Sequence, residues 1–299
     1  MRKVLKKFCY TRYVMGATFG KWETRSLDRR ILYLNKDVNI DEYQGALGWL
    51  FPMKASLGQR RECLKGVIPW YSLQWPRIQA ELDVQEKILI QNTRNESLKI
   101  RIVATIDKHG VYASQGINFV IPKSEEFSIY FLLSLLNSKF MNHLFLKKFL
   151  NLAIKAEYIK QIRFPRLSFN QQQPFIYLAD KMLSLNSDLQ QKRCRFLRRL
   201  QDNFESVKIT GALESFDTME FAEFLKELKK QKITLSLSQQ DEWEDYFNHY
   251  KTECNKLSAE IAETDNDIDL RVYKLYGLTY DEVLVVDKDT KITKEEYEK

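Results

Sequence analysis

A heptad repeat near the C-terminus constrains the fold of this chain more than any other feature of the sequence. Its members recur at alternating steps of four and three residues: Trp243, Phe247, Tyr250, Cys254, Leu257 and Ile261. In an α-helix such residues form one apolar stripe, which a neighbouring helix has to cover. A second run, from Leu178 to Leu200, steps mostly by three, four or seven residues. We therefore expect two long helices that pair as an antiparallel hairpin.

Helix-capping signals occur near the end of the chain. Thr264 or Asp265 is a suitable N-cap for one short helix, and Gly277 is a suitable stop for it. Thr279 and Glu282 form the capping-box pattern of another short helix. The sequence therefore predicts two small helices after the hairpin.

The first half of the chain has a mixed pattern. Apolar or alternating runs predict strands at residues 30–34, 87–91, 98–102, 119–121 and 161–164, and a longer apolar run predicts a helix at residues 129–149. The expected fold class is α+β. A mixed α/β domain would occupy residues 1–170, and a helical domain with the long antiparallel hairpin would occupy residues 171–299.

Charge differs sharply between these two expected domains. Residues 1–170 contain 28 Lys+Arg and 14 Asp+Glu, a net charge of +14, whereas residues 171–299 contain 19 and 26, a net charge of −7. A basic domain joined to an acidic one indicates that the first binds a polyanion such as double-stranded DNA and that the second does not. Charge alone leaves an acidic protein or a membrane surface open as the partner.

The cysteines and the apolar runs indicate a cytoplasmic protein. The four cysteines have no short spacing between them, which suits reduced thiols: Cys9, Cys63, Cys194 and Cys254. The basic residues 2–7 are not followed by the apolar run of a signal peptide. Polar and charged side chains interrupt the most apolar stretch, residues 127–150, so we expect a buried helix there and no membrane span.

Two loop-like patterns depart from known ligand-binding motifs at the positions that bind the ligand. Residues 16–21 approach a phosphate-binding loop, but the loop is one residue short and Trp22 stands where Ser or Thr is required. Residues 265–276 approach a calcium loop, but Leu270 and Tyr276 replace its Gly and Glu. The acidic residues at the start of this second pattern are better explained as a helix N-terminus.

Nuclease, zinc and methyltransferase motifs are also incomplete. Asp217, Glu227 and Lys229 have the spacing of a magnesium-dependent nuclease, but they fall on a helical pattern, where a solvated helix face is expected. The histidines have no zinc-ligand spacing: His109, His143 and His249. The sequence contains neither an Asn-Pro-Pro motif nor a Gly-rich turn for S-adenosylmethionine. We therefore expect no catalytic residue, metal site or cofactor in this chain.

Arginines and aromatic residues are interleaved from Arg60 to Arg77. A guanidinium group can bind guanine O6 and N7 or two phosphate oxygens, and Trp or Tyr can stack on a base. Alternatively, the aromatic side chains belong to the core and the arginines only face solvent. The candidate DNA-binding residues, in this stretch and beyond it, are Arg60, Arg61, Trp70, Tyr71, Trp75, Arg77, Arg94, Lys108, His109, Tyr112 and Lys155.

A series of short motifs runs through most of the chain. They are RILYL at residues 30–34, LGQRR at 57–61, PWYSL at 69–73, EKIL at 86–89, GVYA at 110–113, LLNSK at 135–139, YIKQI at 158–162 and DIDLRVYKLYGL at 267–278. Their order and spacing, from about residue 25 to 286, resemble the TaqI-like C-terminal specificity domain, the target-recognition domain of type IIG restriction enzymes and adenine-N6 DNA methyltransferases.

The resemblance implies that residues 1–170 are a DNA target-recognition domain, which reads a DNA sequence while an adenine-N6 methyltransferase domain or subunit flips and methylates an adenine. The helical hairpin of residues 171–299 would then serve as a spacer or docking domain. S-adenosylmethionine, and Mg²⁺ if a nuclease is attached, would then be bound by that partner. Family members carry the methyltransferase core upstream, so we expect a separate specificity subunit, a gene fragment or a shortened chain. Two alternatives stay open: a general nucleic-acid-binding adaptor, and a fragment of an enzyme with unrecognised nuclease or methyltransferase activity.

Overall fold

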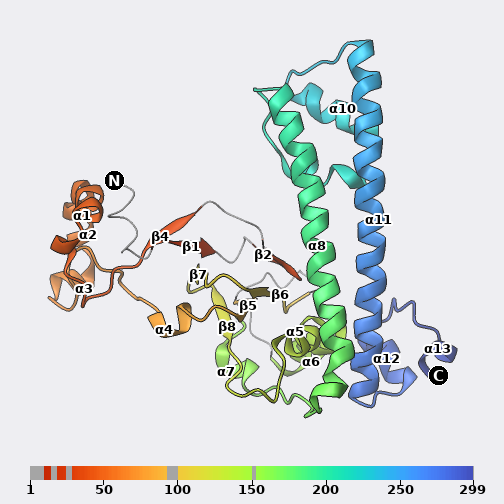
Figure 1. Cartoon of the computed structure of the whole chain (residues 1–299), viewed down its shortest axis with the longest axis horizontal. Coiled ribbons are helices and arrows are strands. Elements are labelled where there is room, and N and C mark those ends of the chain that lie inside the picture. Colours follow the sequence, from red (N-terminus) through yellow and green to blue (C-terminus); the bar gives the residue numbers. More distant parts are fainter. Residues whose placement is uncertain (1–9, 15–18, 25–28, 93–99, 150–152, 299) are drawn as a thin grey trace. The chain divides into compact units, whose positions relative to one another are not determined.

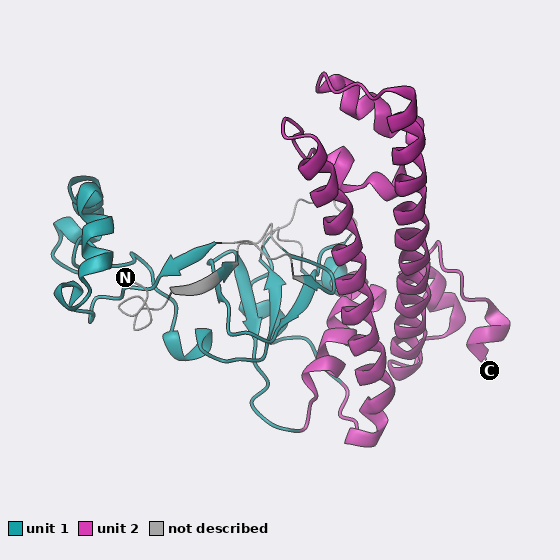
Figure 2. Cartoon of the chain, turned by 45° about the horizontal axis from the view of Figure 1, so that its top comes forward, with its two compact units in different colours: residues 1–125, 145–164 teal, residues 126–144, 165–299 magenta. Residues whose placement is uncertain are grey.

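The chain forms two compact units. The computed structural model describes residues 10–14, 19–24, 29–92, 100–149 and 153–298 (Figure 1). Unit 1 comprises Met1–Glu125 and Phe145–Phe164, and unit 2 comprises Glu126–Leu144 and Pro165–Lys299 (Figure 2). The strands lie in unit 1 and the long helices in unit 2, so the fold is α+β, as expected. Residues 126–144 group with the helical unit, and the domain boundary expected near residue 170 stays a prediction.

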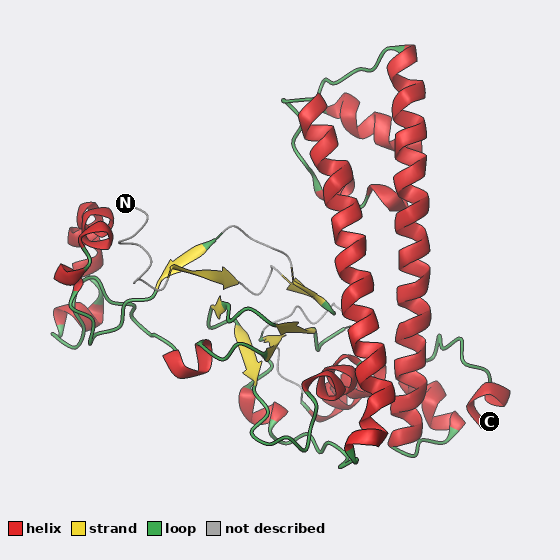
Figure 3. Ribbon diagram, in the orientation of Figure 1, coloured by secondary structure: helices red, strands yellow, loops and turns green. Residues whose placement is uncertain are grey.

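Unit 1 is built on small β-sheets, drawn as yellow arrows in Figure 3. In one sheet β5 (Lys87–Gln91) lies between β6 (Ala104–Asp107) and β8 (Ile117–Val120), with both pairings antiparallel. In another, β1 (Tyr10–Val14) lies between β4 (Arg30–Leu32) and β7 (Tyr112–Ala113), while β2 (Phe19–Gly20) pairs with β3 (Glu23–Thr24). The strand predicted at residues 87–91 is confirmed, and its continuous apolar sequence suits a central strand whose residues 88–90 are completely buried.

A buried ion pair joins β5 to β6. The ammonium group of Lys87 is completely buried and lies 2.9 Å from Asp107 Oδ2. It also donates hydrogen bonds to the backbone carbonyls of Leu82 and Val84, at 2.9 and 2.7 Å. The Asp107 carboxylate accepts two backbone N–H groups of the turn that follows β6, at 2.8 and 2.7 Å. All three donors of the ammonium are therefore used, which compensates for its removal from water.

Short helices occupy the segment between β4 and β5. We call residues 40–70 the arm; it contains η3 (Ile40–Glu42), α1 (Gln44–Leu50), η4 (Phe51–Met53), α2 (Lys54–Gly58) and α3 (Arg61–Leu64). Pro52 lies in the first turn of η4, where its missing N–H would have no helical partner. Gly66, at φ +69°, allows the left-handed turn that follows α3. Helix α4 (Gln79–Leu82) follows the arm.

Unit 2 contains the predicted helical hairpin. Helices α8 (Phe169–Asn203) and α11 (Leu237–Leu275) lie side by side in Figures 1 and 3. Phe204, just after α8, packs its ring 5.6 Å from that of Trp243 near the start of α11. Lys192, which precedes Phe204 along the chain and lies on α8, has its Nζ 2.7 Å from Oε2 of Glu253, which follows Trp243 on α11. The two helices therefore run antiparallel. The hairpin is confirmed, and the heptad side chains from Trp243 to Cys254 are buried in its core.

Shorter helices close the hairpin: α9 (Gly211–Glu214), η5 (Phe216–Thr218) and α10 (Phe221–Lys230). The ring of Phe196 on α8 is completely buried and stacks on that of Phe216, with the centroids 3.8 Å apart. Asp217 is buried and accepts two hydrogen bonds from the Arg193 guanidinium, at 2.9 and 2.6 Å. The solvated helix face expected for Asp217 is therefore wrong, because this ion pair holds the carboxylate in the core.

The helix expected at residues 129–149 is divided into α5 (Ile129–Asn137) and α6 (Lys139–Lys148). Ser138 between them has an extended backbone, at φ −69° and ψ 153°, and its hydroxyl accepts the N–H of Met141. The Lys139 N–H donates to Asp269 Oδ1 on α11 at 2.8 Å. These side-chain oxygens accept backbone N–H groups in the first turn of α6, so the chain begins a new helix there.

The C-terminal region differs from its prediction in one respect. Thr264 and Asp265 lie inside α11 and cap nothing, because the buried stripe continues past them through Ile268 and Val272. The expected end is confirmed: Gly277 has φ +69° after α11, and Thr279 with Glu282 forms a capping box at the start of α12 (Tyr280–Val286). Helix α13 (Lys294–Glu298) follows.

Two expected strands are absent from the described part of the chain. Residues 100–103 and 161–164 have no strand structure, and residues 161–164 instead follow the short helix α7 (Ala156–Ile159). Residues 98–99, like residues 16–18 of the loop-like pattern, lie outside the described residues. Among the described helices, none combines the length and apolarity needed to cross a membrane.

Candidate nucleic-acid interface

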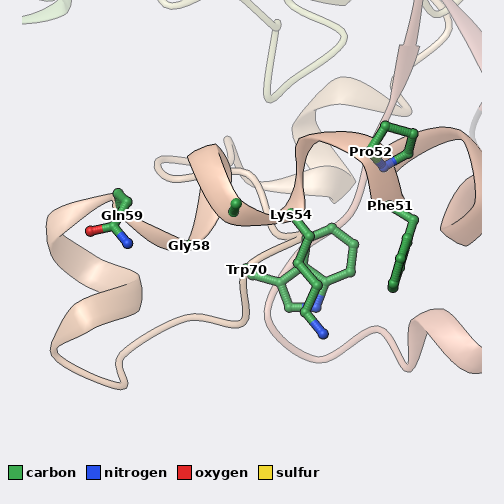
Figure 4. Close-up of a pocket in the computed structure, with 7 residues that line it drawn as sticks. Phe51, Pro52, Lys54, Gly58, Gln59 and Trp70 are labelled. Carbon is green, nitrogen blue, oxygen red and sulfur yellow. The ribbon is translucent and has the colours of Figure 1, made fainter.

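The arm carries an open groove of about 510 Å³. Figure 4 shows Phe51 and Pro52 at one end of it, Gln59 at the other, and Trp70 with Lys54 between them. Lys54 Nζ lies 5.6 Å from the ring centroids of both Phe51 and Trp70. The described lining contains one cation and no carboxylate. A groove with aromatic rings, an amide and an ammonium group suits a flat polar ligand that lies next to an anion.

Arg60 and Tyr71 stabilise the backbone around this groove. Arg60 Nε donates to the carbonyl of Leu57 at 2.8 Å, and its Nη2 donates to that of Trp70 at 2.6 Å. The Tyr71 hydroxyl donates to the carbonyl of Val38 at 2.7 Å. Nε and Nη2 of Arg60 and the hydroxyl of Tyr71 thus donate to backbone carbonyls within the protein, and the DNA contacts expected for these two residues stay predictions. Trp70, a third expected contact, is half-buried and lines the groove.

Arg77 and Tyr112 are integrated into the core of unit 1. Arg77 Nη2 donates to the carbonyl of Ile117, its guanidinium lies 4.5 Å from the Phe119 ring centroid, and burial lowers the pKa of Arg77. Tyr112 is only 2% exposed, and its hydroxyl donates to Asp83 Oδ1 at 2.5 Å. The ring of Tyr112 is buried among core residues, and its expected DNA contact stays a prediction. Arg77 is half-buried as a residue, and its DNA contact also stays a prediction.

The other candidates within the described residues are exposed. Arg61 begins α3, and Trp75, which is 64% exposed, follows the arm. Lys108 and His109 lie in the turn after β6, and Lys155 is the N-cap residue of α7. These side chains are accessible to a partner, and their contact with DNA stays a prediction. Arg94 lies outside the described residues.

Sequence reasoning missed three groove residues, Phe51, Lys54 and Gln59. The arm consists of very short helices, whose few residues give no periodic pattern. The signal that could have drawn attention to it is the apolar run at residues 47–53, LGWLFPM, which has no polar face and no strand pattern. Trp49 and Phe51 in this run are 67% and 59% exposed, and exposed aromatic rings close together in sequence often mark a binding surface.

The described residues offer no arrangement for metal chemistry. Nowhere in the described ranges are three or more His, Cys, Asp or Glu side chains grouped so that they could hold a metal ion. Asp217 is held by Arg193, as described above, and its ion pair closes the helical core.

Among solved structures, the chain is similar to a type IIL restriction–modification enzyme, MmeI, in complex with DNA. The TM-score is 0.42 and the sequence identity is 16%, with 89% of this chain and 32% of that chain covered. The chain therefore spans about a third of the length of that enzyme. No curated protein sequence matches the chain at a significant level.

Two family models match the sequence, on either side of the junction between the basic and the helical parts. One, described as a domain of unknown function (DUF8810), matches residues 168–272, which include α8 and most of α11. The other matches residues 53–164, which include most of the groove and the whole β6-β5-β8 sheet. This second match confirms the resemblance expected from the motifs: residues 53–164 are similar to the TaqI-like C-terminal specificity domain.

Proposed function

We propose that this chain recognises a defined sequence in double-stranded DNA for a restriction–modification system, and that it directs an adenine-N6 methyltransferase to that sequence. The match of residues 53–164 to a specificity domain is the observation that carries the proposal. The matched region contains the groove residues Lys54, Gln59 and Trp70 and the exposed Arg61. It offers side chains for base edges and for phosphates, which sequence recognition and affinity respectively require.

The two parts of the chain would have different roles. The basic residues 1–170, with a net charge of +14, would bind the DNA, and this contact would release counterions. The aromatic core of the α8 and α11 hairpin is closely packed, which would make the hairpin rigid. A rigid acidic strut suits docking to the methyltransferase, since a misplacement of about 1 Å at a reacting centre can cost about a hundredfold in rate.

The methylation chemistry would belong to the partner. S-adenosylmethionine would be bound by the methyltransferase, and Mg²⁺ by a nuclease where one is attached. This chain would act with them in the cytoplasm and would contribute the choice of DNA site.

Selection from a pool of randomised duplexes tests the recognition. The full chain should enrich one sequence, and its binding free energy for that duplex should exceed that for random competitor DNA by several kcal/mol. Binding should weaken on the order of tenfold or more between low and physiological salt, because counterion release is lost. Equal affinity for all duplexes would refute sequence recognition and favour the general nucleic-acid adaptor.

Methyl transfer from radiolabelled S-adenosylmethionine tests the link to adenine methylation. The chain alone should transfer no methyl group, whereas a methyltransferase subunit that lacks its own recognition domain should modify adenine at the selected sequence once the chain is added. Methyl transfer by the purified chain alone would refute this division and support the enzyme alternative. Methylation at cytosine would refute the adenine assignment and leave DNA recognition intact.

A further inference from the structure

The groove of the arm has features that match a DNA base pair with its flanking phosphate. We propose, on the basis of the proposed function, that the groove contacts one base pair of the recognised sequence. Gln59 reads the base edge and favours adenine, Lys54 binds the adjacent phosphate, and the Phe51 and Trp70 rings form the apolar walls of the site.

Gln59 is placed to read a base. Gln59 is the C-cap residue of α2, and its backbone N–H donates to the carbonyls of Leu57 and Ser56. These hydrogen bonds fix its main chain. Within the described residues its side-chain amide has no hydrogen-bond partner, and the side chain is exposed. A glutamine amide can donate to N7 and accept from the N6 amino group of adenine, a pair of bonds that no other base offers in the major groove. An amide that is free and anchored at its backbone suits this contact.

Lys54 gives the groove its charge preference. Its ammonium lies 5.6 Å from each of two ring centroids, which orients it along the groove. No carboxylate lines the described groove; the acidic residues of η3, Asp41 and Glu42, are outside its lining. A cation with no carboxylate in the described lining, beside the exposed Phe51 ring and the half-buried Trp70 ring, complements a phosphate and a base more closely than it complements the carboxylate side chains of an acidic peptide, which have no flat ring to stack.

Arg60 acts as a positioning residue for this site. Its guanidinium donates to the carbonyls of Leu57, near the end of α2, and Trp70, on the wall of the groove. Arg60 thereby fixes the separation between the amide that reads the base and the ring beside it. We expect Arg60→Lys to reduce discrimination at the same base pair as Gln59 variants, because lysine cannot hold both carbonyls with a planar fork.

Selection from randomised duplexes with the full chain provides the main test. Gln59→Ala should lose preference at one position of the selected sequence, by on the order of tenfold, and leave the other positions unchanged. Gln59→Glu should move that preference toward cytosine, whose N4 amino group can donate to a carboxylate. Lys54→Ala should weaken all sequences alike and reduce the slope of log affinity against log salt by about 1.

A variant with a larger side chain tests whether DNA binds at the groove, independently of the polar contacts. A Cβ added at Gly58 meets no atom within 4 Å, so Gly58→Leu should fold normally and place its side chain at the groove. Gly45 on α1 is equally open and does not line the groove, so Gly45→Leu is the matched control. We expect Gly58→Leu to lose on the order of tenfold or more in specific affinity and Gly45→Leu to bind as the unmodified chain does.

The outcomes separate the two proposals. If the unmodified chain selects no sequence, the proposed function fails, and the groove assignment fails with it. If the unmodified chain selects a sequence, the Gln59 variants keep its preference at every position, and the Lys54 and Gly58 variants bind it as tightly as the unmodified chain does, DNA recognition stands and the groove assignment is overturned. The groove assignment is also overturned if these variants keep DNA selection but lose association with the methyltransferase, since the groove would then bind protein.

Discussion

Removal of the Asp107 carboxylate should destabilise unit 1 strongly. In Asp107→Ala the ammonium of Lys87 stays completely buried but loses the carboxylate 2.9 Å away. Two backbone N–H groups of the turn after β6 lose their acceptor as well. Breaking a buried ion pair from one side costs about 3–5 kcal/mol, and one orphaned backbone group adds about 1 kcal/mol where water cannot reach it. These contributions sum to about 4–6 kcal/mol, and we expect a loss of at least about 4 kcal/mol, a large part of the total stability of a domain.

Hydrogen exchange at the β5 amides of the full chain measures this loss where it occurs. Exchange reports the free energy with which a region opens, so the helical unit does not obscure the result. In Asp107→Ala, the amides of residues 88–90 should exchange on the order of 10³-fold faster. Each 1.4 kcal/mol changes the opening equilibrium by a factor of ten, so a loss of about 4 kcal/mol corresponds to this change in rate. Glu298→Ala, which removes an exposed ion pair with Lys294, should change these rates by less than about twofold.

The double variant Asp107→Leu with Lys87→Met distinguishes the ion pair from simple loss of packing. Replacing both charges by apolar groups of similar size is often close to neutral, so the double variant should exchange more slowly than Asp107→Ala. The reasoning would be refuted by an Asp107→Ala variant that loses less than about 1 kcal/mol. It would equally be refuted by a double variant as unstable as the two single changes combined.

Other side chains lead to further expectations. Arg61→Ala should weaken DNA binding without lowering the melting temperature, since Arg61 is exposed, whereas Arg77→Ala should lower both because it also removes contacts in the core. Asp217→Ala should cost about 3 kcal/mol in urea unfolding, because it leaves a partly buried guanidinium without its carboxylate; a loss below about 1 kcal/mol would contradict a structural role. Burial raises the pKa of Cys254 to about 11, so iodoacetamide at pH 8 should label the exposed Cys194 first, and equal labelling rates in the folded protein would contradict this. Because the folded state favours the neutral thiol, the contribution of Cys254 to stability should be lost as the pH rises from about 9 to 11. Over this pH range the melting temperature of a Cys254→Ala variant should therefore decline less steeply than that of the unmodified chain.

Long-range periodicity explains which parts of the fold the sequence could predict. The stripe from Trp243 to Ile261 repeats over several helical turns, and only a long helix with a covering partner satisfies it. Strand β5 was predictable for a related reason, because a short apolar run with flanking polar residues suits a central strand. Both signals lie in contiguous sequence and depend little on distant residues.

Elements whose limits depend on distant side chains could not be predicted. The division between α5 and α6 at Ser138 is supported by Asp269, which is 130 residues away in sequence from Lys139. The arginines show the same dependence: their chemistry suits phosphates, bases and backbone carbonyls alike, and only the fold brings the Trp70 carbonyl to Arg60 and the Ile117 carbonyl to Arg77. Residue type therefore identified the region of the candidate site but not which side chains face outward.

The repeated passage of the chain between its units limits how such a protein can be divided. The chain leaves unit 1 after residue 125, returns at residue 145 and leaves again after residue 164. The intervening α5 is almost entirely buried, and the Phe131 ring packs 5.2 Å from that of Phe175 on α8. A fragment cut at residue 170 would keep α5 and lose the helix that covers it, leaving an apolar face that promotes aggregation. An exchange of units between related proteins would therefore have to move both units together, or replace residues 126–144 by a linker, because no single crossover point exchanges one unit alone.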